Sequence, residues 1–178
     1  MIYIALFRGL NVGGHHKIKM ADLCAFLNRH GGENTKHYIQ SGNLVFHHDD
    51  SLAALAQKLE PAFADTFGFQ SQIVLRTLPQ LQAAQKAYPF DREDREQKFM
   101  MTGFARATPN DDALELLTSL ATEKELVAQQ GEAFFFYFGD GSGRSKIANL
   151  NFEKKIGTAL TIRNRRTISK LIEMAEKI

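Results

Sequence analysis

The strongest constraint on the fold is an order of predicted elements that occurs twice along the chain. In residues 1–78, short apolar runs at Ile2–Phe7 and Gln72–Arg76 predict the outer strands. Between them lie two helical patterns separated by a hairpin, whose turn is indicated by Ser41-Gly42-Asn43 between Lys36–Gln40 and Leu44–His48. The predicted order in this half is therefore β-α-β-β-α-β.

Capping residues set the predicted helix boundaries in this half. The first helix covers Met20–His30 and ends at a Gly-Gly pair. The second begins after Ser51, a residue type favoured at helix N-caps. Pro61 predicts a kink or a break inside it, and Gly68 predicts its end, with Phe69 packing back on the last turn.

The same order recurs in the second half. Its predicted elements are strand Lys98–Phe104, helix Asp111–Leu120, strands Glu125–Gln130 and Ala133–Phe138, helix Ser145–Ile156, strand Ala159–Arg163 and a final helix from Arg165. This pattern predicts an α+β protein with two ferredoxin-like (βαββαβ) sandwiches in tandem and a C-terminal helix. The first subdomain covers residues 1–78, a connecting helix and linker cover 79–97, and the second subdomain with the C-terminal helix covers 98–178.

The connectivity brings distant loops together. In a βαββαβ unit the first two strands run parallel and the last two run opposite to them, so strand ends alternate between two edges of the sheet. In the first half, Arg8–Lys17 should lie beside Gln40–Asn43 at one edge. In the second half, Gly139–Lys146 should lie beside Arg163–Thr167 at the opposite edge.

Three predicted helices begin beside positive charge. A helix N-terminus carries partial positive charge, so basic residues do not stabilise it, and local rules broken in this way tend to mark function. Exposed N–H groups together with basic side chains suit an anion, often a phosphate. The residues concerned are Lys17 and Lys19, Arg144 and Lys146, and Arg163, Arg165 and Arg166.

The first candidate site follows the first strand. Glycines let a backbone turn its N–H groups toward a ligand, and Arg8 offers a planar fork for a carboxylate or phosphate. The loop lacks the G-x-G-x-x-G spacing of dinucleotide-binding folds. The alternative is a tight strand-to-helix turn in which Arg8 pairs with an acid. The ligand-binding residues predicted here are Arg8, Asn11, Gly13, Gly14, Lys19, Ser41 and Asn43.

The second candidate site is the glycine-rich run Gly139–Lys146, which leads from a strand into a helix as phosphate loops do. It does not have the register of a Walker A motif. The alternative is a flexible turn in which Ser145 caps the following helix, and Asn164 could likewise cap the last helix. The ligand-binding residues predicted here are Arg144, Ser145, Lys146 and Asn164.

Composition excludes several classes of protein. The single cysteine, Cys24, rules out an internal disulfide and a cysteine-based metal cage. His15-His16 and His47-His48-Asp49-Asp50 lack the spacing of a zinc site, so no metal and no cofactor are predicted. No apolar run approaches the length of a membrane span, and the N-terminus has no signal-peptide pattern, so we expect a cytoplasmic protein without a membrane partner.

Charge is unevenly distributed. The net charge is only +2, which argues against coating by nucleic acid. Residues 89–143 carry 5 basic and 11 acidic groups, whereas residues 144–178 carry 9 basic and 3 acidic groups. The basic segment could attract an anionic ligand, or it could pair with the acidic segment before it.

These observations support binding of a small anionic ligand, such as a nucleotide or a phosphorylated metabolite. The second hypothesis is an RNA-binding sheet face, which requires Phe135 and Tyr137 to be exposed and is less favoured because the strand lacks the usual basic and small residues. The third is a protein-interaction domain with an apolar surface patch. Enzymatic activity is left open, because Ser41, Ser145 and Asp140 have no evident histidine partner.

Several sequence blocks also resemble a family. The blocks at residues 5–14, 17–23 and 38–43, with Gly143–Lys146 and Thr161–Leu171 near the other end, resemble the family called domain of unknown function 1697. The resemblance covers nearly the whole chain and implies two ferredoxin-like subdomains, but it implies no particular activity. The family's late pattern usually has a Trp after Arg-Asn, where this chain has Arg165. A stacking role for that position would here fall to an arginine.

Overall fold

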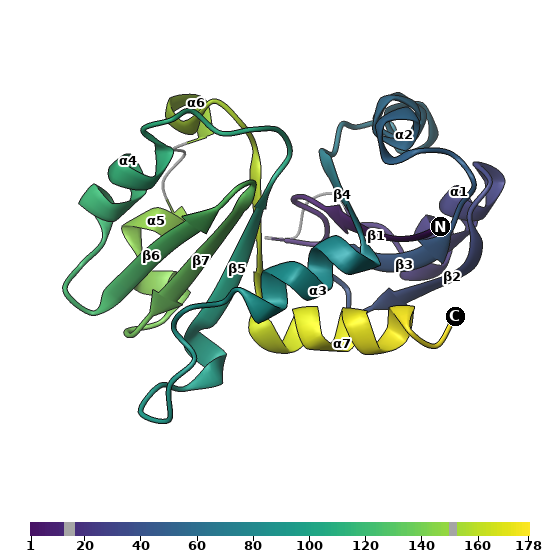
Figure 1. The fold of residues 1–178 in the computed structure, drawn as a ribbon. Helices are drawn as coiled ribbons and strands as arrows, with labels where there is room; N and C mark the ends of the chain where they lie inside the picture. Colours follow the sequence, from purple (N-terminus) through teal and green to yellow (C-terminus); the bar gives the residue numbers. More distant parts are fainter. Residues whose placement is uncertain (13–16, 150–152) are drawn as a thin grey trace. The chain divides into compact units, whose positions relative to one another are not determined.

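The computed structural model describes residues 1–12, 17–149 and 153–178 (Figure 1). The chain divides into two compact units. The first unit comprises Met1–Gln82 together with Ser169–Ile178, and the second comprises Ala83–Ile168. The end of the C-terminal helix, predicted as part of the second subdomain, thus belongs to the first unit.

The first unit contains a four-stranded sheet in the order β2-β3-β1-β4. Every neighbouring pair is antiparallel, so β1 and β2 run in the same direction, as the connectivity predicted. Its elements are β1 (Ile2–Phe7), α1 (Met20–Arg29), β2 (Glu33–Tyr38), β3 (Asn43–His47), α2 (Leu52–Phe67), β4 (Ile73–Thr77) and α3 (Leu78–Lys86), which continues into the second unit.

The core of this unit lies between α1, α2 and one face of the sheet (Figure 1). Alternate residues of β1 point into it because side chains of a strand alternate between the two faces. Phe63 of α2 is fully buried at its centre, with ring centroids 5.5 Å from Phe7, 5.8 Å from Phe26 and 5.3 Å from Phe69. The predicted contact of Phe69 with the end of the helix is therefore present.

Pro61 does not break α2. The helix is continuous from Leu52 to Phe67 and ends at Gly68, which has φ 77°. Ser51 caps it, since its Oγ accepts a hydrogen bond from the backbone N–H of Ala54 at 3.3 Å. Pro61 is exposed while the buried face continues on both sides of it, so packing compensates for the lost backbone hydrogen bond.

The second unit repeats the arrangement with a sheet in the order β6-β7-β5-β8, again with antiparallel neighbours. The predicted helix over Ser145–Ile156 is described in two short parts, and Leu150–Phe152 lie outside the described residues. The elements are η1 (Gln97–Phe99), β5 (Met100–Ala105), α4 (Ala113–Leu120), β6 (Glu125–Gln130), β7 (Ala133–Phe138), η2 (Ser142–Arg144), α5 (Lys146–Asn149), α6 (Glu153–Ile156), β8 (Leu160–Asn164) and α7 (Arg165–Ala175), which ends in the first unit.

The aromatic strand β7 contributes buried rings to both faces of this sheet. Phe134, Phe136 and Phe138 lie in the core under α4, α5 and α6. Phe135 points to the other face and is 2% exposed, with its ring 5.8 Å from that of Tyr88. The Tyr88 hydroxyl donates to the backbone carbonyl of Phe136 at 2.7 Å and so fixes the segment before β5 to the sheet.

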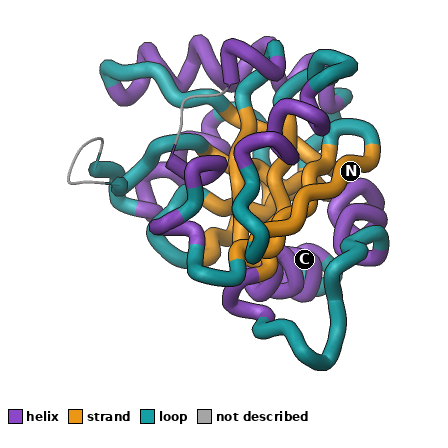
Figure 2. The backbone as a smooth tube through the Cα atoms, turned by 90° about the vertical axis from the view of Figure 1, so that its left-hand side faces the viewer, coloured by secondary structure: helices purple, strands orange, loops and turns teal. Residues whose placement is uncertain are grey.

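Figure 2 shows the strands in orange, the helices in purple and the loops between them in teal. Among the described helices, none combines the length and the apolar character that crossing a membrane would need.

Candidate functional site

The loop edge of the first unit is assembled by one amide side chain. Asn11 Nδ2 donates to the carbonyls of Ile18 at 3.1 Å and Gln40 at 2.7 Å, and its Oδ1 accepts from the N–H of Ile18 at 2.9 Å. The backbone N–H of Phe7 also donates to the carbonyl of Gly42 at 2.8 Å. The predicted meeting of the loop after β1 with the hairpin turn is therefore present.

Asn43 closes the turn from inside the unit. Its Nδ2 donates to the carbonyl of Tyr38 at 3.2 Å and to Oγ of Ser41 at 2.8 Å. The side chain has no exposed surface, so none of its atoms is open to a ligand. Ser41 is half-buried beside it. Both predicted residues hold the shape of the turn.

The cations at this edge face solvent. Arg8 is exposed, and its Nη1 donates to Gln72 Oε1 at 3.1 Å. Lys19 is exposed at the N-cap of α1 and makes no side-chain capping hydrogen bond. Gly13 and Gly14, also predicted as ligand-binding, lie outside the described residues.

This edge also carries backbone strain and exposed apolar side chains. Ile39 has φ 51° and is 48% exposed, and Val12 is 66% exposed. A positive φ is unfavourable for a β-branched residue, so Ile39 is a genuine outlier. Gly42 has φ 70°, and a Cβ there would lie 2.7 Å from the Cβ of Phe7, so no larger residue fits. The turn is thus held tightly against β1 while two aliphatic side chains face solvent.

In the second unit, the glycine-rich run Gly139–Lys146 forms a turn and a short helix. Ser145 is 2% exposed, and its Oγ accepts from the N–H groups of Ile147 at 3.1 Å and Ala148 at 3.4 Å. This is the capping role named as the alternative for this residue. Arg144 and Lys146 are exposed on either side of it.

Asn164 occupies the predicted position at the start of the last helix. Its Oδ1 accepts from the N–H of Arg166 at 2.9 Å, and its Nδ2 donates to the carbonyl of Lys98 at 2.9 Å. The strand order places β5 between β7 and β8, so the loop after β7 and the start of α7 flank the beginning of β5.

A depression in the second unit brings together residues outside the predicted ligand-binding set. It has a volume of about 310 Å³ and is lined by Arg95, Glu123, Lys124, Leu126, Tyr137 and Gly139. The guanidinium of Arg95 lies 5.4 Å from the ring centroid of Tyr137 and 5.9 Å from that of Phe90. Its Nη1 donates to the carbonyl of Phe90 at 3.3 Å. Two rings and one carbonyl therefore hold this half-buried arginine in place.

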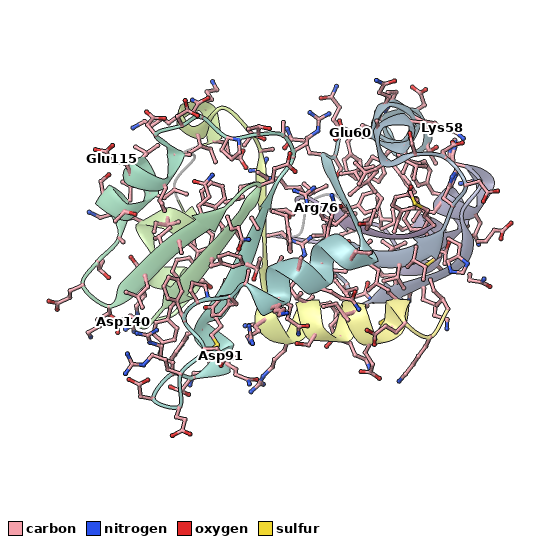
Figure 3. The ribbon with its side chains drawn as sticks, viewed as in Figure 1. Lys58, Glu60, Arg76, Asp91, Glu115 and Asp140 are labelled. Atoms are coloured by element: carbon pink, nitrogen blue, oxygen red, sulfur yellow. The ribbon has the colours of Figure 1, made fainter. Side chains whose placement is uncertain are left out.

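The glycine-rich loop forms one wall of the depression. The N–H of Gly139 donates to the carbonyl of Lys124 at 3.1 Å, and a Cβ at Gly139 would lie 2.7 Å from that oxygen. The Lys124 ammonium pairs with Asp140 at 3.1 Å; Asp140 lies at the end of β7 (Figure 3). Only glycine allows this close approach of the two segments.

Little in the local sequence indicates a binding role for Arg95. It lies in the charged run Asp91–Lys98, most of which falls in the predicted connecting helix and linker over residues 79–97. The only available signal was the neighbouring Phe90, an aromatic residue in an otherwise polar segment. The position of Arg95 over Tyr137 depends on the tertiary path of the segment before β5.

Two other arginines are buried or half-buried within their own units. Arg76 of β4, labelled in Figure 3, is 7% exposed, and its Nη1 donates to the carbonyl of Leu75 at 2.7 Å. Burial lowers the pKa of Arg163 in β8 to about 10, so it remains a cation at neutral pH. Arg165 lies 4.9 Å from the ring centroid of Tyr88 and pairs with Asp91, so its stacking partner is part of the protein.

No group of three or more His, Cys, Asp or Glu side chains is placed to hold a metal in the part of the chain that the structure describes. His48 is buried and bonded on both ring nitrogens. Nε2 lies 2.9 Å from the carbonyl of His30, and Nδ1 accepts from the N–H of Asp50 at 2.9 Å. Its ring therefore supports the local backbone.

Residues 1–135 match the family described as Protein of unknown function (DUF1697). The chain belongs to this family. Among solved structures, this DUF1697 protein is similar to the conserved bacterial protein SP0830 from Streptococcus pneumoniae, with 28% sequence identity and a TM-score of 0.79 over 98% of each chain. No curated protein matches it. The structural similarity to this neighbour covers residues of both units.

Proposed function

We propose that this DUF1697 protein binds a small ligand through an anionic group held by Arg95. The observation that carries the proposal is the fixed position of this guanidinium on the wall of the depression. Among the described residues, no carboxylate lies within ion-pair distance of it. Its remaining N–H groups are donors for a carboxylate or a phosphate.

Preorganisation favours such a site. A planar guanidinium recognises a carboxylate or phosphate through two parallel hydrogen bonds. Side chains that are already ordered lose less conformational freedom on binding. Arg95 is ordered by Tyr137 and Phe90 before any ligand arrives. Because Gly139 lines the same depression, the proposed site includes this end of the glycine-rich loop. A ligand-binding role for Arg8, Lys19, Arg144 and Lys146 stays a prediction.

Two further inferences, on the fold and on the location of the protein, accompany this proposal. The strand order of each sheet and the placement of helices on one face support ferredoxin-like sandwiches in both units. A cytoplasmic location stays a prediction.

Isothermal titration calorimetry with adenosine monophosphate, glucose 6-phosphate and citrate tests the proposal. We expect heat of binding with at least one of these anions, and Arg95→Gln should weaken it about tenfold or more, since hydrogen bonds to charged groups contribute about 1.5–3 kcal/mol. Arg92→Gln is the matched control, because Arg92 is exposed and pairs with Asp94 at 3.3 Å. Equal affinity of the wild type and Arg95→Gln would contradict the proposal.

A second candidate function is protein interaction, which is favoured by the exposed aliphatic side chains of Val12 and Ile39 at one loop edge. The RNA-binding hypothesis has less support. It required an exposed Phe135, but this ring is 2% exposed and packs against Tyr88.

A further inference from the structure

Among the described charged residues that line the depression in the second unit, one cation and one anion have no ion-pair partner. Lys124 and Asp140 neutralise each other through their ion pair at 3.1 Å. Arg95 and Glu123 both line the depression, and in the described part of the chain neither has an ion-pair partner within 4.0 Å. They are also not paired with each other. Residues of opposite charge therefore line one depression without pairing with each other.

We infer that the natural ligand is a small zwitterion of the amino-acid type, and this inference rests on the proposed anion site. Its carboxylate would bind the guanidinium of Arg95, and its ammonium group would lie at the carboxylate of Glu123. A ligand with both charges satisfies both side chains, whereas a simple anion satisfies Arg95 and is repelled by Glu123.

The remaining walls indicate what the rest of the ligand carries. Leu126 and Tyr137 are half-buried and present aliphatic and aromatic surface to the depression. Burial of an apolar side chain against them would contribute to affinity in proportion to the area removed from water. A volume of about 310 Å³ lies at the lower end of the roughly 300–1,000 Å³ typical of ligand pockets. It suits a molecule of the size of one amino acid with an apolar side chain.

Three probes that share a phenyl ring separate the contribution of each charge. Phenylalanine carries both charges at pH 7, 3-phenylpropionate carries only the carboxylate, and 2-phenylethylamine carries only the ammonium group. Calorimetry and chemical-shift perturbation of the full-length chain should give the tightest binding for phenylalanine. The expected advantage over 3-phenylpropionate is about two- to fivefold, the range for an exposed ion pair.

Two variants assign each charge to its residue. Glu123→Gln should remove the advantage of phenylalanine over 3-phenylpropionate and leave the affinity for 3-phenylpropionate unchanged or higher. Arg95→Gln should remove the advantage of phenylalanine over 2-phenylethylamine. Glu115→Gln is the matched control, because Glu115 is exposed on α4 and is not among the residues that line the depression. Far-ultraviolet circular dichroism and melting temperature establish that each variant is folded.

The outcomes separate this inference from the proposed function. If 3-phenylpropionate binds as tightly as phenylalanine and both depend on Arg95, the anion site stands and the zwitterion is excluded. If phenylalanine binds with the same affinity to the wild type and to both variants, the inference is overturned. If folded protein binds none of the three probes, the inference also fails, and the phosphate and citrate titrations then decide the proposed function independently.

Discussion

At the scale of single residues, amide side chains determine the shape of the loops in the first unit. Asn11 makes three hydrogen bonds with backbone groups and adopts φ 56°. Asn11→Ala should destabilise the protein by about 2–4 kcal/mol, because backbone groups lose their partners and alanine is strained at positive φ. Urea denaturation measures this change in the free energy of unfolding.

Asn34→Ala is the control for the backbone contribution. Asn34 also has a positive φ, 52°, but its exposed side chain has no hydrogen bond recorded among the described residues. The difference between the two variants therefore reports the hydrogen bonds of Asn11. Equal losses would contradict the structural role assigned to this amide.

At Ile39 a substitution should stabilise the protein rather than destabilise it. Its φ of 51° is strained and its side chain is 48% exposed, so little burial opposes the strain. Ile39→Asn should raise the stability by about 1 kcal/mol, because asparagine tolerates the left-handed region. Ile39→Val keeps the strain and should change the melting temperature little. A melting temperature for Ile39→Asn at or below that of the wild type would refute the prediction.

His30 should make stability depend on pH. Burial, then the charges of Lys58 and Arg29, lower its pKa below the ordinary value of 6.5. The unfolded chain then binds more protons than the native state just below pH 6.5, so this residue lowers stability as the pH falls through that window. His30→Gln should reduce the slope of stability against pH just below pH 6.5. Chemical denaturation across this range checks it, and an unchanged slope would exclude the assignment.

At the scale of elements, one tyrosine anchors the segment between the two predicted repeats. The buried hydroxyl of Tyr88 donates to the carbonyl of Phe136 in β7 at 2.7 Å. Tyr88→Phe should destabilise the protein by about 1 kcal/mol because that carbonyl loses its partner. Tyr38→Phe is the control, since Tyr38 is half-buried and no hydrogen bond joins its hydroxyl to another of the described residues. The comparison needs only the two changes in the free energy of unfolding, and similar values would refute the anchoring role.

Most elements could be predicted from local pattern. The strands Glu125–Gln130 and Ala133–Phe138 and the start of the last helix at Arg165 are observed at the predicted residues. Alternation and turn residues are local properties, so they are readable in the chain. The prediction that Pro61 could break the helix was wrong, because the buried residues on both sides of Pro61 hold α2 together. Tertiary packing outweighs local propensity at such a position.

At the scale of the whole molecule, the end of the chain completes the first unit. Ser169–Ile178 belongs to this unit, Leu171 and Ala175 are fully buried, and Gln82 Nε2 donates to Glu176 Oε1 at 2.8 Å (Figure 1). A chain ending at Ile168 should lose protection against hydrogen exchange in β1–β4, because buried apolar residues are removed. The strands β5–β8 should be affected less.

A chain ending at Ala175 is the matched control. It removes Glu176 and Lys177, which are exposed, together with Ile178, and keeps the buried residues of α7. Its exchange in β1–β4 should resemble that of the full chain. If the truncation at Ile168 instead affects β5–β8 more than β1–β4, the assignment of this segment to the first unit is incorrect.

The sequence by itself determined the order of elements, the strand directions that follow from it, and the meeting of the loop after β1 with the turn at Gly42. These follow from periodicity, capping and connectivity, which depend on neighbouring residues. Only the tertiary structure decided that Asn43 is buried, that the last residues of the chain complete the first unit, and that Arg95 lies over Tyr137. Each of these depends on which distant side chains come into contact. Packing across the whole unit determines those contacts, so a local sequence pattern contains no information on them.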